Sequence, residues 1–132
     1  MADVEARFDK NIALAKKSKP ATTVVKHKKP SSLALAEMMA GGKSGFFDMV
    51  YIDGSHRAPE VLTDAVMSFH LLKIGGIMIF DDYLWHMEAA GAQNPLNMPK
   101  PAIDAFLNIF MQKMQVIGNK PLHQMYARKS AN

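Results

Sequence analysis

Two apolar runs that each end in carboxylates contain the residues best suited to chemistry. Residues 46–52 lead into Asp53, and His56 follows three positions later. Residues 77–80 lead into the pair Asp81-Asp82. In an open parallel sheet, ligands bind at the carboxyl ends of the strands. We therefore expect three carboxylates and a histidine to meet at one edge of a sheet.

These residue types suit a hard cation and oxygen-centred chemistry. Carboxylate oxygens are the ligands of Mg²⁺ and Ca²⁺, and Mg²⁺ keeps waters and substrate atoms as further ligands. Asp53, Asp81 and Asp82 are thus candidate metal ligands. His56 is a candidate general base for a substrate hydroxyl, since histidine exchanges its proton near neutral pH. The aspartates can equally serve as helix caps and turn formers, and His56 can be a surface turn residue.

Length and composition limit the class of protein. The 132 residues fit one domain, and 48% of them are apolar, which is enough for a sizeable core. The absence of cysteine excludes disulfides and thiolate metal sites. No apolar run approaches the roughly 20 residues of a membrane span, and the N-terminus lacks a signal-peptide pattern. We expect a cytoplasmic protein that does not enter a membrane.

The net charge of +4 is concentrated in the first third of the chain. Two lysine-rich runs, residues 16–19 and 26–29, account for most of the excess. Such runs are typical of a solvated surface, although they also occur in nucleic-acid patches. No aromatic residue is interleaved with these lysines, so base stacking has little support and a nucleic-acid partner is not expected.

The elements that must position the candidate site follow from apolar spacing. Helices are expected over residues 4–17, 33–39, 59–72 and 103–114, and strands over residues 22–25, 46–52, 77–80, 116–117 and 124–127. The strand at 46–52 is expected to be buried, because strands covered on both faces are continuously apolar. Gly75-Gly76 is expected to form a tight turn, and residues 85–101 a loop that is a candidate lid. This alternation predicts a three-layer α/β sandwich with a mostly parallel sheet and a terminal antiparallel strand.

The run Phe47-Asp48-Met49-Val50-Tyr51-Ile52-Asp53-Gly54-Ser55-His56, followed by a helix and the run from Leu71 to Trp85, closely resembles class I S-adenosylmethionine-dependent methyltransferases. The closest branch is that of the metal-dependent O-methyltransferases, and the resemblance is strongest over residues 46–85. It implies a Rossmann-like fold, S-adenosylmethionine as the cofactor and methyl transfer to a small acceptor, namely a hydroxyl.

The resemblance also implies roles for single residues. Asp53, Asp81 and Asp82 match the positions at which the family binds Mg²⁺ or another divalent cation. His56 matches the base of some sugar-modifying members, and Asp53 stands beside it as the second candidate catalytic residue. Ser31 or Ser32 falls where the family places an adenine-contacting serine, and Asp53 is the further candidate for cofactor binding.

The sequence departs from the family pattern at its N-terminus. The family's first strand, its Gly-rich turn and its second strand, which cradle the cofactor, have no counterpart here. We therefore expect a Rossmann-like domain truncated at its N-terminus, with an exposed sheet edge that favours a homo-oligomer. Three alternatives stay open: a non-catalytic module that acts through oligomerisation, a nucleic-acid-associated protein that uses its basic face, and an unrelated α/β enzyme that uses the carboxylates with another substrate.

Overall fold

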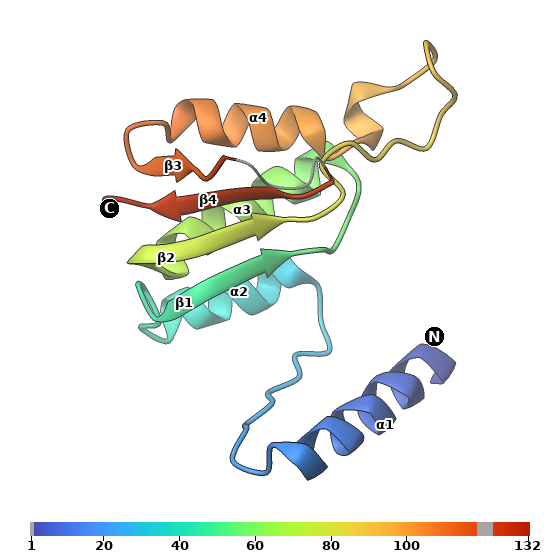
Figure 1. Ribbon diagram of the computed structural model, residues 1–132, viewed down its shortest axis with the longest axis vertical. Helices are drawn as coiled ribbons and strands as arrows, with labels where there is room; N and C mark the ends of the chain where they lie inside the picture. The colour runs from blue at the N-terminus through green and yellow to red at the C-terminus, as the bar shows by residue number, and fades with distance from the viewer. Residues whose placement is uncertain (1, 119–122) are drawn as a thin grey trace.

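The computed structural model describes residues 2–118 and 123–132, which form four α-helices and one mixed sheet (Figure 1). The helices are α1 (Ala2–Ser18), α2 (Ser31–Ala40), α3 (Ala58–Leu71) and α4 (Lys100–Ile109), with a short 3₁₀ helix, η1 (Pro95–Asn97). The strands are β1 (Phe47–Ile52), β2 (Leu72–Phe80), β3 (Met114–Val116) and β4 (Met125–Lys129). No helix of the described residues combines the length and the apolar character that crossing a membrane requires.

The sheet has the strand order β1-β2-β4-β3. β1 and β2 run parallel and are joined by the crossover helix α3, whereas β4 runs antiparallel to both β2 and β3. The expected α/β class and the truncated Rossmann-like architecture are confirmed. The parallel part of the sheet is the β1–β2 pair, and the expected C-terminal antiparallel pair is present.

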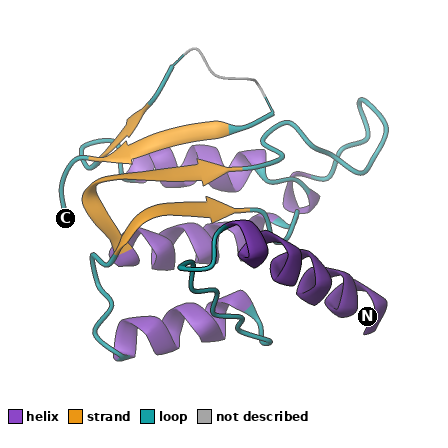
Figure 2. Cartoon of the chain, turned by 60° about the horizontal axis from the view of Figure 1, so that its bottom comes forward, coloured by secondary structure: helices purple, strands orange, loops and turns teal. Residues whose placement is uncertain are grey.

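One face of the sheet, here called the covered face, packs against helices. Helix α3 contacts β1 and β2, and α2 and α4 flank α3 on the same side (Figures 1 and 2). The strands turn alternate side chains toward these helices, because successive side chains in a strand point to opposite faces. The core between them consists chiefly of Ile52, Val61, Ala65, Phe69, Leu72, Met78, Phe80, Ala102, Ile103, Phe106, Met114 and Ala127.

The opposite face, here called the open face, has no helix packed on it among the described residues. It carries Met49 and Tyr51 of β1, Ile77 and Ile79 of β2, and Tyr126 of β4. Met49 is 59% exposed and Tyr51 is 46% exposed, so β1 is not buried on both faces as its apolar run predicts. The expected third layer is thus not formed by the described helices. A continuous apolar run does not distinguish a strand that is covered twice from one that is covered once.

The expected strand at residues 22–25 is wrong. These residues are irregular and exposed, and no strand of the described residues lies beside them to accept their backbone hydrogen bonds. The segment instead returns along α1, which lies apart from the sheet (Figure 1). Lys26 Nζ contacts Glu5 Oε1 at 3.1 Å and Asp9 Oδ1 at 2.7 Å, and Lys28 Nζ contacts Glu5 Oε2 at 2.6 Å. Part of the basic run is therefore paired within the chain.

Two further boundaries differ from the sequence prediction. Gly75 and Gly76 do not form a separate turn, because β2 begins at Leu72 and bulges through them. A Cβ on Gly76 would lie 2.8 Å from Leu72 Cδ1 and 3.0 Å from the Asp48 carbonyl oxygen, so only glycine allows this close pairing. Helix α4 ends at Ile109, and Met114 belongs to β3, where it is buried.

Candidate functional site

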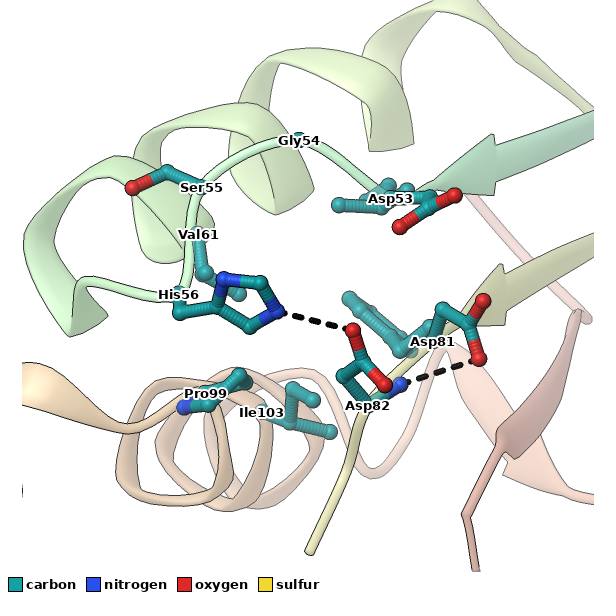
Figure 3. Close-up of a pocket in the computed structure, with 11 residues that line it drawn as sticks. Asp53, Gly54, Ser55, His56, Val61, Asp81, Asp82, Pro99 and Ile103 are labelled. Carbon is teal, nitrogen blue, oxygen red and sulfur yellow. Dashed lines mark hydrogen bonds and ion pairs between the residues drawn. The ribbon is translucent and has the colours of Figure 1, made fainter. Parts of the chain in front are cut away.

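The candidate site lies where β1 and β2 end, as the strand pattern predicts (Figure 3). The turn after β1 supplies Asp53, Gly54, Ser55 and His56, and the turn after β2 supplies Asp81 and Asp82. These turns line a small pocket whose apolar floor consists of Ile52, Val61, Phe80, Pro99 and Ile103. The expectation that both acidic clusters and the histidine share one edge therefore holds in the structure.

His56 and Asp82 form the central polar contact of this pocket. His56 Nε2 lies 2.8 Å from Asp82 Oδ2, and both side chains are more than one third exposed. Because an ionised carboxylate only accepts hydrogen bonds, Nε2 carries the hydrogen and donates it. The indole of Trp85 stacks on the imidazole, with ring centroids 3.9 Å apart and an interplanar angle of 28°. The histidine is thus held on one edge by a carboxylate and on one face by an aromatic ring.

The backbone of Asp82 has an uncommon conformation that aims its side chain. Its φ of 53° lies in the left-handed region, which aspartate visits more readily than most residues other than glycine. Its backbone N–H donates to Asp81 Oδ1 at 3.0 Å. In Figure 3 the Asp82 carboxylate faces His56, whereas those of Asp53 and Asp81 face away from it. Asp81 and Asp82 are adjacent in the chain, but their carboxylates point in different directions.

Asp81 lines the pocket, and its carboxylate is hydrogen-bonded to side chains of the open face. The Tyr51 hydroxyl donates to Asp81 Oδ2, and Gln124 Nε2 donates to Asp81 Oδ1 at 3.1 Å. The hydrogen bond from Tyr51 lowers the pKa of Asp81, with smaller contributions from Gln124 and the Asp82 backbone. The same bond raises the pKa of Tyr51 to about 12.

The predicted metal site does not fit this arrangement. No group of three acidic or histidine side chains in the described residues is placed to hold a cation. Asp81 is bound by Tyr51 and Gln124, and Asp82 is bound by His56. Asp81 and Asp82 meet at one sheet edge, as expected, but accept hydrogen bonds from separate partners.

The predicted cofactor residues lie around a second hollow, between α2 and β1. Ser31 and Asp53 both line it, together with apolar atoms of Ala34, Leu35 and Ile52. Ser32 lines an adjoining hollow that Ser31 shares. Pro30 is the N-cap of α2, and Ser31 Oγ donates to Asp64 Oδ1 at 2.7 Å. Asp53 lines this hollow and also the pocket of His56, so it stands between the two.

The loop that follows the acidic pair is attached to α4. The Tyr83 hydroxyl donates to Asp104 Oδ1 at 2.7 Å, and Lys100 contacts the other oxygen of the same carboxylate. Asn97 Nδ2 donates to Glu88 Oε1 at 2.9 Å within the loop. Of the candidate lid, Trp85 contacts His56 and Pro99 lines the pocket.

Sequence reasoning missed three features of the site. It did not pair His56 with Asp82, stack Trp85 on the imidazole, or connect Tyr51 and Gln124 to Asp81. The contact of Tyr51 with Asp81 depends on the register of β1 and β2, which pairs Tyr51 with Ile79, two positions before Asp81. The pairing with Gln124 depends on the register of β4, which local sequence does not specify.

Comparison with known proteins agrees with this architecture. A family model described as a methyltransferase domain matches residues 2–83. A crystal structure of a protein from Corynebacterium glutamicum matches with a TM-score of 0.55 and 14% sequence identity. That match covers 80% of this chain and 46% of the other, so the chain spans less than half of that structure, and the likeness concerns the fold alone. A search among curated proteins found no match.

The family model covers more than half of the chain, including both strand ends of the site. The matched residues include the acidic turns after β1 and β2 and the helix between them. S-adenosylmethionine is the cofactor that such a domain implies. The chain belongs to the methyltransferase domain family.

Proposed function

We propose that this chain supplies the acceptor side of an S-adenosylmethionine-dependent O-methyltransferase that acts on a small hydroxyl compound. The observation that supports this proposal is the contact of 2.8 Å between His56 Nε2 and Asp82 Oδ2 at the carboxyl ends of β1 and β2. A histidine oriented by a carboxylate is suited to accept a proton from a hydroxyl. The family assignment adds the methyl donor.

The proposed chemistry requires little beyond a base and alignment. With its hydrogen on Nε2, His56 keeps the lone pair on Nδ1, and this atom takes the acceptor's hydroxyl proton. S-adenosylmethionine would supply the methyl group to the acceptor oxygen and leave as S-adenosylhomocysteine, and Ser31 and Asp53 are the residues that would hold it. Alignment of the acceptor oxygen with the methyl group would make the largest contribution to the rate, because it lowers the activation barrier by roughly 7–11 kcal/mol in well-oriented cases. Asp82 keeps the imidazole oriented throughout.

We propose that the cofactor approaches through the hollow between α2 and β1. Ser31 and Asp53 line this hollow, and Asp53 also reaches the pocket of His56. Because the chain covers 46% of the solved structure of the same fold, we propose the transfer for an assembly that also contains a glycine-rich cofactor turn. That turn can come from the same polypeptide or from another.

Calorimetric titration with S-adenosylhomocysteine, with and without Mg²⁺, is the first test. Micromolar binding that weakens in Ser31→Ala and Asp53→Asn supports the cofactor hollow. Absence of binding to the chain and to its assembly would contradict the proposal. Transfer is then followed from radiolabelled S-adenosylmethionine to catechol and to methyl glucoside. His56→Gln should lower the rate by about 10²–10⁴-fold, as loss of a general base does. His86→Gln, on the exposed loop, is the matched control and should retain activity.

A second candidate function is a non-catalytic module that pairs with another copy of itself, as two complementary surfaces of the chain suggest. The open face exposes Met49 and Tyr51, and α1 lies apart from the sheet with Val4, Phe8 and Leu14 exposed. The 17 residues of α1 span about 25 Å, which suits strands of this length. We propose that α1 of one copy covers the open face of another, burying both apolar surfaces.

Light scattering after size-exclusion chromatography tests this candidate. A dimer that Phe8→Lys and Met49→Lys each dissociate would support it. Ile109→Lys, which changes an exposed apolar residue on α4, is the control and should leave the dimer intact. A monomer at all concentrations would contradict the candidate.

A further inference from the structure

Four polar side chains from three neighbouring strands meet on the open face, directly behind the acidic turn. They are Tyr51 of β1, Asp81 after β2, Gln124 before β4 and Tyr126 of β4, here called the tyrosine clasp. Gln124 Nε2 donates to the Tyr51 hydroxyl at 3.0 Å and to Asp81 Oδ1 at 3.1 Å. The Tyr126 hydroxyl donates to Gln124 Oε1 at 2.5 Å. The clasp therefore joins β1 to β4 across β2 through side chains alone.

The strand register brings the clasp together. Tyr51 pairs with Ile79, and Ile79 pairs with Tyr126, so both tyrosines lie in one row across the sheet. The next row contains Asp81, with Gln124 opposite it. Hydrogen bonds to a carboxylate are shorter and stronger than those between neutral groups. The carboxylate of Asp81 is therefore the centre of the clasp.

The same carboxylate is connected to the pocket on its other side. Asp81 Oδ1 accepts the backbone N–H of Asp82 at 3.0 Å, and Asp82 is the residue with a φ of 53°. The Asp82 side chain then accepts from His56 Nε2. An unbroken series of hydrogen bonds thus runs from Tyr126 on the open face to the imidazole in the pocket.

We propose that the tyrosine clasp is a positioning device for His56. By fixing the Asp81 carboxylate, it holds the backbone of Asp82 in its left-handed conformation and so aims the Asp82 carboxylate at Nε2. Tyr51, Gln124 and Asp81 are positioning residues that touch no reacting atom. The inference rests on the proposed role of His56 as base, and it extends the site to the open face of the sheet.

The clasp would also oppose cation binding at Asp81. The two oxygens of Asp81 already accept hydrogen bonds from Tyr51, Gln124 and the Asp82 backbone. A cation at Asp81 would have to displace these donors and release Asp82. Asp81 therefore cannot bind a cation and position His56 at the same time.

Nitrogen NMR of the His56 side chain tests the proposal without any cofactor or acceptor. At a pH of about 8, where histidine is neutral, the wild type should show one tautomer with the hydrogen on Nε2. Tyr51→Phe and Gln124→Ala should each shift these signals toward a mixture of both tautomers. Asp48→Asn breaks another contact between β1 and β2, the ion pair of Asp48 with Lys73 at 2.7 Å, and should leave the His56 signals unchanged.

The outcomes separate the alternatives. If both clasp variants retain a folded amide spectrum and wild-type His56 signals, the proposal is overturned. If Tyr51→Phe unfolds, Gln124→Ala decides alone, because it keeps the bond between Tyr51 and Asp81. Titration with Mn²⁺ adds a second readout: no binding is expected in the wild type, and tight binding that Asp81→Asn abolishes would overturn the proposal. If the clasp variants alter the His56 signals but His56→Gln remains active, the clasp positions His56, and the proposed role of His56 as general base is wrong.

Discussion

The two faces of this sheet are built from the same strands and hold different kinds of contact. On the covered face, Met78, Phe80 and Ala127 are fully buried against helices. On the open face, Tyr51 remains 46% exposed and is joined to its neighbours by hydrogen bonds. Apolar burial is non-directional, whereas hydrogen bonds specify angles and distances. We infer that the covered face supplies stability and the open face supplies the orientation of the site.

The hydrogen bonds on the two faces also differ in the kind of acceptor. Lys129 lies on the covered face, almost completely buried, and its Nζ donates to the Phe69 carbonyl at 2.8 Å and the Leu72 carbonyl at 2.9 Å. The ammonium also lies 4.2 Å from the centroid of the Phe69 ring. This lysine binds the end of α3 to β4 through backbone acceptors. The clasp on the open face uses side-chain acceptors, which can rearrange.

The largest difference between the faces should appear in core truncation. Phe106→Ala removes a fully buried ring that packs near Phe69, Phe80 and Phe110, and should lower the free energy of unfolding by about 3–5 kcal/mol. Met49→Ala on the open face should change it by about 0.5 kcal/mol or less. Urea denaturation followed by circular dichroism measures both. Equal effects would mean that the open face is covered in solution.

A smaller effect is expected from Lys129→Met, which removes the donor to two buried carbonyls. The free energy of unfolding should fall by about 2 kcal/mol at neutral pH. Burial lowers the pKa of Lys129, with a further contribution from Lys113, so the unfolded chain binds more protons in the alkaline range. The wild type should therefore gain stability relative to the variant as pH rises toward about 10.4. Denaturation at pH 7 and at pH 10 measures the difference in free energy of unfolding between wild type and variant. A difference that becomes smaller at pH 10 would contradict this account.

A smaller effect on stability than that of Lys129→Met is expected from Tyr51→Phe, and its pH profile identifies the clasp. The pKa of Asp81 is lowered, so its contribution is complete above about pH 3.9 and is lost as pH falls through the lower folded value. The pKa of Tyr51 is raised to about 12, so its contribution is complete below about pH 10 and is lost as pH rises through 12. The difference in melting temperature between wild type and variant should be flat between these limits and shrink outside them. If the difference in melting temperature persists in acid, the effect of Tyr51→Phe comes from packing and not from the hydrogen bond to Asp81.

The local elements could be predicted because each depends on its own apolar spacing. The apolar residues of α3 and α4 recur at helical intervals, and β1 and the core of β2 are apolar runs that end in aspartates. The irregular course of residues 22–25 could not be predicted, because a strand also needs a neighbour, and none is present among the described residues. β-Branched residues favour extended backbone, but they form a strand only when a neighbouring strand pairs with them.

The sequence by itself determined that Asp53, His56, Asp81 and Asp82 meet at one sheet edge, since parallel strands that end in these residues leave them no other place. Only the tertiary structure decided which of them contact one another. The register of β4 brings Gln124 to Asp81, and the left-handed backbone of Asp82 turns its carboxylate to His56. The physical reason is range: apolar periodicity acts over a few residues, whereas these partners are separated by 43 and 26 positions in the chain.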